Sequence, residues 1–308
     1  MEKLVFNHLY NFCRDNKILT WRNSGFKPLD SAINQLVYIT HKIYKYLDEG
    51  REICMVYLDI TKAFERVWHV GLLHKLEMYG TDGNLHRWLK DYLTNRKQRV
   101  VLNGVASEWR NVGAGVPQGS ILGPLLFLFF LNDIIDDVGS DIFLYADDSC
   151  LMKVINDPVN SIYELNSDLE TISNWANRRA VNVSAPKCNY MVISRKKHKL
   201  DLPPVRFNDH LGVTFTSNMT WHEHIKSKIA KTAKNDEYAY KLICFLPRSC
   251  KERIYIAFIR TILEYGCLLY NNIPMYLSHL LENCQRNIAI VCTGAYRHTS
   301  HNQITRCC

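Results

Sequence analysis

The sequence has no C-x-x-C pair, no apolar run long enough to cross a bilayer and no internal repeat. Most of its 11 cysteines stand singly, several inside apolar segments, which is typical of buried, reduced thiols in an intracellular protein and argues against a disulfide framework. The longest apolar run, ILGPLLFLFFL at 121–131, falls short of the roughly 20 residues that a membrane helix needs. We therefore expect no membrane partner, and the polar opening MEKLVFNHLYNF predicts no secretory signal.

Spacings typical of zinc sites are also missing. Residues 284–308 collect cysteine and histidine, but their spacing matches no common zinc site. The sequence alone leaves open whether this segment binds a metal.

Basic charge exceeds acidic charge. The 308 residues include 38 Lys and Arg against 30 Asp and Glu, a formal net charge of +8. A surplus of this size suits a polyanionic partner such as a nucleic acid, although many basic proteins bind none. With 47% hydrophobic residues, the chain can bury one large core or two modest ones.

The hydrophobic pattern changes near residue 217. Up to that point strand and helix patterns are mixed, and beyond it the chain reads as helical almost throughout. This pattern predicts an α+β fold with two domains, at 1–217 and 218–308. The elements expected in the first domain are helices at 31–50, at 159–178 and from about Ser120, strands at 53–60 and 189–194, and a hairpin at 98–109 that turns at Asn103-Gly104.

The stretch IFLYADDSCLM at 142–152 places two adjacent aspartates inside an apolar run. Consecutive residues of a strand face opposite sides of a sheet, so a plain strand would send only one of Asp147 and Asp148 toward a given point. A tight turn could bring both toward it. The alternatives are an aspartate-rich surface turn and a metal site completed by a third carboxylate.

Asp59 is the candidate for that third carboxylate, because it closes the apolar strand MVYLDI at 55–60. Its alternative position is a solvated place at the rim of the sheet. Three carboxylates at one point repel each other by about 4 kcal/mol per pair at 4 Å and an effective dielectric of 20, so such a cluster needs a cation. Oxygen ligands without neighbouring His or Cys favour Mg²⁺, and two such ions can support phosphoryl transfer.

These aspartates belong to an ordered series of motifs. The series runs NSGFKPLDSAINQL (23–36), VYLDITKAFERVWHVGLLHKL (56–76), WLKDYLTNRKQRVVLNG (88–104), GAGVPQGSILGPLLF (113–127), LYADDS (144–149), VNVSAPKC (181–188), HLGVTF (210–215) and ERIYIAFIRTILEYG (252–266). It resembles the reverse transcriptases of non-LTR (LINE-type, jockey-like) retrotransposons over nearly the whole chain. The resemblance implies a right-hand polymerase, with partial fingers and palm at 1–217 and an all-α thumb at 218–308.

The resemblance also implies the catalytic roles. Asp59 and Asp147 would hold two Mg²⁺ ions, and Asp148 would be the lesser partner on the same turn. Lys187 matches the lysine that the family places near the leaving pyrophosphate, whereas outside the family it would be an ordinary surface lysine. The implied reaction is nucleotidyl transfer from a dNTP to the 3′-hydroxyl of a DNA primer on an RNA template.

Further residues would contact the nucleotide or the primer by the same resemblance: Phe64, Gly115, Gln118, Gly119 and Tyr145. Phe64 would exclude a 2′-hydroxyl sterically, and the two glycines would let the backbone pass close to template and substrate. Without the family, Phe64 reads as a core residue and the glycines as loop residues. Leu211 and Gly212 would form the primer grip.

The sequence departs from the family in several places. Glu65 replaces the usual Asp of the motif AFD, Ser184 and Cys188 replace Asn and Thr, and segment 206–213 joins two patterns that the family separates. The chain also starts downstream of the family's first finger motifs. The alternative function is therefore a catalytically impaired, truncated remnant that keeps the fold and binds nucleic acid weakly.

The resemblance implies a nuclear location, because the family primes on chromosomal DNA. The basic loop RKKHK at 195–199 is too short for an import signal. It is either a solvated charge run or a contact for the product duplex.

Overall fold

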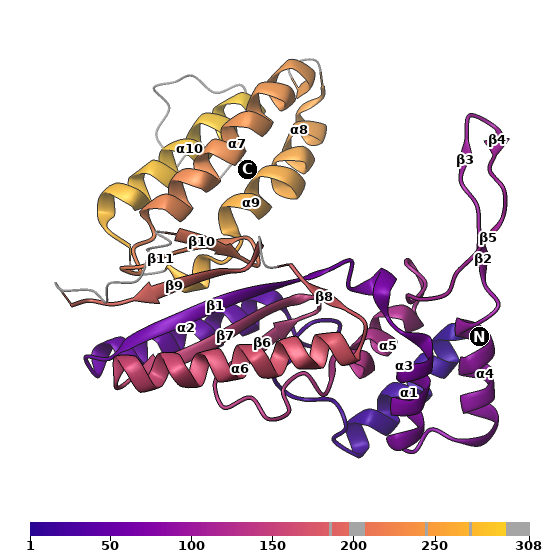
Figure 1. Cartoon of the computed structure of the whole chain (residues 1–308). Coiled ribbons are helices and arrows are strands. Elements are labelled where there is room, and N and C mark those ends of the chain that lie inside the picture. The colour runs from indigo at the N-terminus through magenta and orange to yellow at the C-terminus, as the bar shows by residue number, and fades with distance from the viewer. Residues whose placement is uncertain (185–186, 197–206, 244–245, 271–272, 294–308) are drawn as a thin grey trace. The chain divides into compact units, whose positions relative to one another are not determined.

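The computed structural model describes residues 1–184, 187–196, 207–243, 246–270 and 273–293. The chain divides into two compact units, Met1–Val205 and Arg206–Cys308. The first unit mixes strands and helices, and the described part of the second is helical apart from one short hairpin, so the α+β class is confirmed (Figure 1). The domain boundary expected at 217 lies inside the second unit, after that hairpin.

The helices of the first unit are α1 (Glu2–Asp15), α2 (Ala32–Asp48), α3 (His69–Met78), α4 (Gly83–Leu93), α5 (Leu122–Leu131) and α6 (Pro158–Arg178). Its strands are β1 (Glu52–Thr61), β2 (Lys97–Gln98), β3 (Val101–Leu102), β4 (Val105–Ala106), β5 (Arg110–Asn111), β6 (Asp141–Tyr145), β7 (Asp148–Ile155), β8 (Asn182–Val183) and β9 (Asn189–Ile193). A 3₁₀ turn covers Phe64–Arg66.

Local sequence explains where the two long helices of this unit begin. The Ser31 side chain accepts a hydrogen bond from the Asn34 backbone N–H ahead of α2, and Asp157 accepts one from the Asn160 N–H ahead of α6. Such caps satisfy backbone donors that the first turn leaves free. Pro158 occupies the first turn of α6, where its missing N–H leaves no hydrogen bond unmade.

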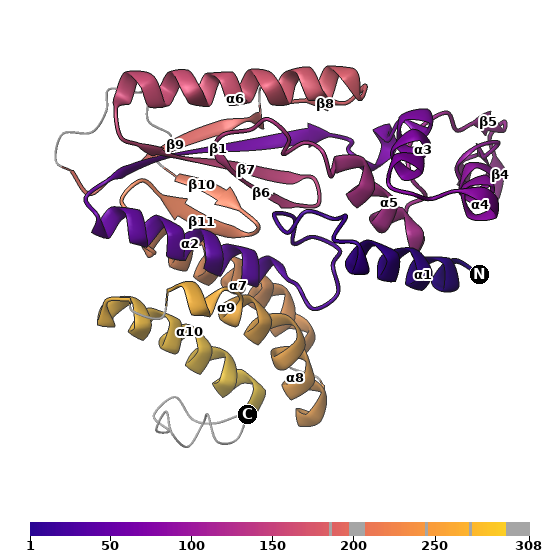
Figure 2. The ribbon, with the colours of Figure 1, turned by 90° about the horizontal axis from the view of Figure 1, so that it is seen from below.

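A five-stranded antiparallel sheet forms the centre of the first unit. The strands β6, β7 and β1 lie side by side, and β8 and β9 both pair with the other edge of β1. In Figure 2 the sheet lies between α6 and α2. Side chains of β1 alternate between the faces, and Leu58 and Val56 line an apolar cavity together with Leu165 and Ile172 of α6. Asp59 therefore points away from α6.

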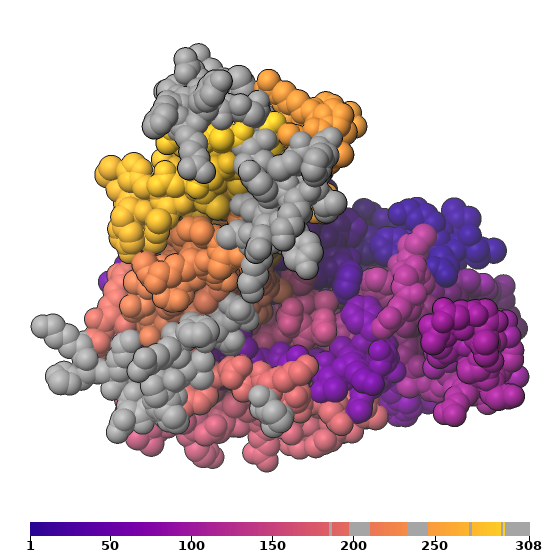
Figure 3. Space-filling model, turned by 90° about the horizontal axis from the view of Figure 1, so that it is seen from above, coloured from indigo at the N-terminus to yellow at the C-terminus, as the bar shows by residue number. Residues whose placement is uncertain are grey.

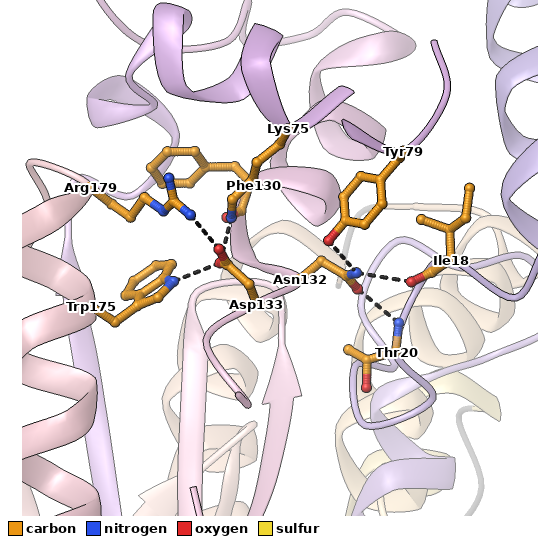
Figure 4. Close-up of polar contacts among 9 residues, drawn as sticks. All are labelled: Ile18, Thr20, Lys75, Tyr79, Phe130, Asn132, Asp133, Trp175 and Arg179. Carbon is orange, nitrogen blue, oxygen red and sulfur yellow. Dashed lines mark hydrogen bonds and ion pairs between the residues drawn. The ribbon is translucent and has the colours of Figure 1, made fainter. Parts of the chain in front are cut away.

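A buried charge cluster ties three helices together at Asp133, just after α5 (Figure 4). The Asp133 carboxylate accepts hydrogen bonds from Lys75 of α3, from Trp175 of α6 at 2.6 Å and from Arg179. Burial lowers the pKa of Lys75 to about 8, although Asp133 opposes this shift. The two cations and the indole outweigh burial at Asp133 itself, whose pKa is lowered. The carboxylate therefore stays charged and holds α3 and α6 against the end of α5.

Asn132, the neighbour of Asp133, fastens the chain that follows α1. Its side-chain oxygen accepts a hydrogen bond from the Thr20 N–H at 2.8 Å. Its amide donates to the Ile18 carbonyl at 2.9 Å and to the Tyr79 hydroxyl at 3.0 Å. Of the two residues after α5, Asp133 thus contacts α3 and the end of α6, and Asn132 contacts the segment that follows α1 (Figure 4).

The second unit begins with the hairpin of β10 (Phe207–His210) and β11 (Val213–Thr216). Its helices are α7 (His222–Ile243), α8 (Arg248–Ile254), α9 (Thr261–Glu264) and α10 (Met275–Thr293), with a π-helical turn at Tyr255–Arg260. No helix in the described part of the chain is both long enough and apolar enough to cross a membrane. The Cys and His residues after Thr293 and most of the basic loop RKKHK lie outside the described residues.

Candidate active site

The two adjacent aspartates lie at a tight turn between β6 and β7. Tyr145, the half-buried last residue of β6, pairs with Asp148, so only Ala146 and Asp147 form the loop. Ala146 has a φ of 58°, and a positive φ at the first loop residue alone is the pattern of a type II′ turn. A non-glycine residue in this region is strained by roughly 1–3 kcal/mol, and such strain is concentrated at functional sites.

Strand register brings Asp59 and Asp148 together. Asp59 of β1 is the direct cross-strand partner of Asp148 of β7, and Cβ atoms of directly opposed residues lie about 5 Å apart on the same face. Asp147 lies in the adjoining turn. The ladder therefore pairs Asp59 with Asp148, the aspartate that the family resemblance ranks behind Asp147.

The carboxylates repel each other. Partial burial raises the pKa of Asp148, and the negative charges of Asp147 and Asp59 raise this pKa further. The Lys187 ammonium supplies positive charge, because its Nζ lies 3.3 Å from Oδ1 and 3.4 Å from Oδ2 of Asp59. The Ser184 N–H donates to the Asp59 carbonyl at 2.9 Å. This bond holds the segment before Lys187 beside β1.

The donor chemistry suits Mg²⁺, but the ligands are not arranged as a closed cage. Among the residues that the structure describes, no three His, Cys, Asp or Glu side chains are placed so that they could hold a metal ion. Burial, and after it the charges of Asp147 and Asp59, raise the pKa of Asp148, and carboxylate oxygens are the ligands that Mg²⁺ prefers. The Lys187 ammonium already offsets part of the negative charge at Asp59. The three aspartates are therefore of the right chemical type for a hard divalent cation, and their binding of one stays a prediction.

Phe64, five residues after Asp59, packs against two other aromatic rings. Its ring stacks on Phe127 of α5 with centroids 4.3 Å apart, and Phe26 meets it edge-on at 5.6 Å. The Val116 N–H donates to the Phe64 carbonyl at 2.9 Å. Phe64 is half-buried, so it packs on the core and keeps part of its surface free, and its role in nucleotide selection stays a prediction.

The loop at 113–119 is fixed against the segment after β1. Gly115 has a φ of +89°, and a Cβ there would come within 2.8 Å of the Glu65 carbonyl oxygen, so this position requires glycine. The Gly115 N–H donates to the Val67 carbonyl at 2.8 Å. Gly119 has a φ of +78° with no neighbour near its Cβ position, and Gln118 is exposed to solvent.

Two supports of the site were not identified from the sequence. The His69 ring nitrogen Nε2 lies 2.7 Å from the Gly115 carbonyl oxygen. Nothing in the run RVWHV marks this contact in advance.

The second support is the segment Asn23–Gly25, which packs against the β6–β7 turn. The Ser24 N–H donates to the Leu144 carbonyl at 2.9 Å, and the same carbonyl accepts from the Gln35 side chain at 2.8 Å. A Cβ on Gly25 would overlap the backbone of Ala146. The motif NSGF belongs to the series of family motifs, but no local pattern indicates this supporting role.

Leu211 and Gly212 lie in the second unit, at the turn between β10 and β11. Their φ angles of 49° and 73° make this a type I′ turn, and the Tyr265 hydroxyl donates to the Leu211 carbonyl at 2.7 Å. The site in the first unit is therefore described without them, and their role as a primer grip stays a prediction.

Comparison with known families gives one match that covers most of the chain. The family model "Reverse transcriptase (RNA-dependent DNA polymerase)" matches residues 1–238. The chain is 27% identical over 294 residues to the RNA-directed DNA polymerase from mobile element jockey of Drosophila melanogaster, covering 88% of this chain and 31% of that protein. It is also 27% identical to the probable RNA-directed DNA polymerase from transposon X-element of the same species, covering 95% of this chain and 34% of that protein. The chain spans about a third of the length of these relatives.

Solved structures show the same fold at low sequence identity. Telomerase from Candida albicans, solved with a fragment of telomeric RNA, superposes with a TM-score of 0.53 at 13% identity and covers 99% of this chain and 57% of that one. Apo telomerase from Candida tropicalis gives 0.53 at 10% identity, covering 99% of this chain and 59% of that one. Identities this low support the fold alone.

Proposed function

The chain belongs to the reverse transcriptase family, and from that premise we propose that it is the polymerase domain of a jockey-like non-LTR retrotransposon. It extends the 3′-hydroxyl of a DNA primer with dNTPs on an RNA template. The observation that carries this proposal is the cross-strand pairing of Asp59 with Asp148 beside the Asp147 turn. A surface turn rich in aspartate would need no third carboxylate directly opposite it.

The aspartates would hold two Mg²⁺ ions, which supply Lewis-acid stabilisation of the attacking and leaving oxygens. Asp59, Asp147 and Asp148 are the residues of this chain that would bind them. Lys187, whose ammonium contacts Asp59, would donate a proton to the leaving pyrophosphate oxygen. Proton transfer by a positioned side chain contributes about 10²–10⁴-fold to rate.

Phe64 would select deoxynucleotides. The stacked Phe127 and the edge-on Phe26 hold its ring in one position, so the ring cannot move aside for a 2′-hydroxyl. Gln118, exposed on the loop beside it, would contact the incoming nucleotide. Tyr145 would lie near the primer terminus.

Primer extension tests this proposal directly. The purified chain is given a DNA primer annealed to an RNA template, with Mg²⁺ and either dNTPs or rNTPs. We expect extension with dNTPs, much weaker extension with rNTPs and none without a divalent cation.

An inactive chain that still binds the primed template would point instead to an impaired copy of the polymerase. A chain that neither extends nor binds the primed template would contradict the proposal. Efficient extension in EDTA would show that the reaction needs no divalent cation and would contradict the metal part of the proposal.

A further inference from the structure

The hairpin between Asn95 and Val112 takes no part in the site described above. Its strands β2 and β5 pair at the base and β3 and β4 at the tip, where Asn103-Gly104 forms the type I′ turn. Every residue from Lys97 to Asn111 is exposed. In Figure 1 the hairpin projects away from α3 and α4, and Figure 3 looks down on its magenta atoms.

The hairpin carries a local excess of positive charge. Its four basic side chains stand against a single acidic one, Glu108. The basic residues are Arg96, Lys97, Arg99 and Arg110. Within the described chain none of the four has a carboxylate at ion-pair distance. Their charge is therefore available to an anionic partner.

One face of the hairpin combines cations with an aromatic ring. Lys97 pairs with Asn111 and Gln98 with Arg110, so Arg99 follows opposite Trp109, on the same face as Lys97. The Arg99 guanidinium lies 4.6 Å from the Trp109 ring centroid. The indole is still 57% exposed. Exposed aromatic rings beside cations are typical of surfaces that bind single-stranded nucleic acid.

The base of the hairpin is joined to the proposed active site. The Val112 N–H donates to the Arg96 carbonyl at 2.8 Å, which closes the base. The chain then enters the loop at 113–119, whose Gly115 and Val116 are hydrogen-bonded to the backbone at Val67 and Phe64. A nucleic-acid strand bound to the hairpin would therefore run toward the backbone segment that carries Phe64.

We propose that this hairpin binds the unpaired part of the template strand next to the active site. The inference rests on the proposed function and adds a contact surface to it. Lys97 and Arg99 contact phosphates on the face that carries Trp109, and Trp109 stacks on an unpaired base. Arg110, the cross-strand partner of Gln98 on the other face, adds positive charge to the hairpin. A duplex offers the same phosphates but hides its base faces. The apolar tip, with Val101, Leu102 and Val105 exposed, is too small for a stable protein interface.

Fluorescence anisotropy with two substrates tests this inference. One is a blunt RNA–DNA duplex, and the other carries a single-stranded 5′ RNA extension. The variants are Lys97/Arg99/Arg110→Ser and Trp109→Ala, with Lys17/Lys45/Lys90→Ser as the charge-matched control at exposed sites elsewhere in the unit. Circular dichroism and the melting temperature verify folding, which exposed positions should leave unchanged.

We expect the triple hairpin variant to bind the extended substrate at least about tenfold more weakly and to lose about 2 from its log–log salt slope. Trp109→Ala should weaken the same binding about tenfold with the salt slope unchanged. Both variants should bind the blunt duplex as the wild type does, and so should the control variant with both substrates.

Unchanged binding of the extended substrate by the triple variant would overturn the inference. Equal losses for both substrates would show a duplex contact and would overturn it as well. Loss of self-association in light scattering, with RNA binding kept, would show a protein contact instead. Primer extension by the same wild-type preparation, measured in parallel, shows whether the proposed function stands when the hairpin contact fails.

Discussion

Single residues decide the electrostatics of the proposed site. Asp148 lies opposite Asp59 and next to Asp147, and both charges raise its pKa together with partial burial. Among the described residues, the Lys187 ammonium forms an ion pair only with Asp59. In that part of the chain the three aspartates thus share one ion-pair partner, and a carboxylate cluster with surplus negative charge favours the binding of a cation.

Asp148→Asn should stabilise the metal-free protein at neutral pH. The folded-state pKa of Asp148 lies above the unfolded value of about 3.9, so its ionisation weakens folding once the pH rises past these values. We expect a rise in melting temperature on the order of 1 °C in EDTA at pH 7.5, and a smaller change at pH 3.5, where the carboxyl is mostly protonated in both states. Asp91→Asn, at an exposed helical position, is the control. A lower melting temperature of Asp148→Asn at pH 7.5 would show that the Asp148 carboxylate is not destabilised by burial and by the charges of Asp147 and Asp59.

Lys187→Gln should bind Mg²⁺ more tightly and react more slowly. The substitution removes the ammonium that contacts Asp59, so the carboxylate is freed for the metal. We expect Mg²⁺ affinity, measured by isothermal titration calorimetry, to rise about fivefold, which is the size of a surface ion pair. The rate of single-nucleotide incorporation should fall about 10²-fold or more. Weaker Mg²⁺ binding would show that Lys187 does not compete for Asp59.

At the scale of elements, the β6–β7 hairpin depends on a segment more than a hundred residues earlier in the chain. Asn23 forms a parallel bridge with Leu144, and Gly25 lies against the backbone of Ala146. This contact supports the strained turn from outside the sheet. A positive φ at Ala146 can persist because its surroundings determine it.

Gly25→Ala tests this support. The added Cβ would overlap the Ala146 backbone, so we expect a loss of about 1–3 kcal/mol in the free energy of unfolding. The rate of primer extension should fall at least about tenfold, because the turn that carries Asp147 must shift. Gly113→Ala is the matched control, since no atom lies within 4 Å of a Cβ there. Equal losses of unfolding free energy for the two substitutions would show that the contact of Gly25 with Ala146 does not stabilise the turn.

Most elements of the first unit could be predicted from local pattern. The expected strand at 53–60 is β1 (Glu52–Thr61), and the expected helix at 159–178 is α6 (Pro158–Arg178). The turn at Asn103-Gly104 is confirmed because both residues must adopt a positive φ, which Asn and Gly tolerate best. Helix α1 was not predicted, since no capping side chain marks its start.

Contacts between distant elements could not be predicted in the same way. The pairing of Asp59 with Asp148 is a matter of strand register, and a shift of one residue would have placed Asp147 there instead. The contact of His69 with Gly115 depends on how α3 packs, which no local pattern encodes. The family resemblance named the aspartates, and only the fold shows how they are paired.

At the scale of the whole molecule, the buried Asp133 cluster joins helices that the sequence separates widely. Asp133 is the common partner of Lys75 and Arg179. Its pKa is lowered in the fold, so it contributes stability above the unfolded value of about 3.9. This stability is lost as the pH falls through its folded-state pKa.

Asp133→Asn should therefore destabilise the first unit strongly. The substitution leaves the Lys75 ammonium buried without its carboxylate, and we expect a loss of about 3–5 kcal/mol in the free energy of unfolding at pH 7. Adding Lys75→Met should recover part of the loss. Asp136→Asn, at an exposed position nearby, should change stability by less than about 0.5 kcal/mol. Urea unfolding of these three variants and of Lys75→Met alone measures this, and additive losses for Asp133 and Lys75 would contradict a shared cluster.

The central claim is that the turn carrying Asp147 is the catalytic centre of an RNA-templated DNA polymerase. The most direct measurement is the rate of single-nucleotide incorporation on a primed RNA template by Asp147→Ala, compared with wild type and with Asp91→Ala. The account predicts a fall of about 10³-fold or more for Asp147→Ala, the effect of several kcal/mol of lost charge stabilisation, and an unchanged rate for Asp91→Ala. Incorporation by Asp147→Ala at the wild-type rate would contradict it.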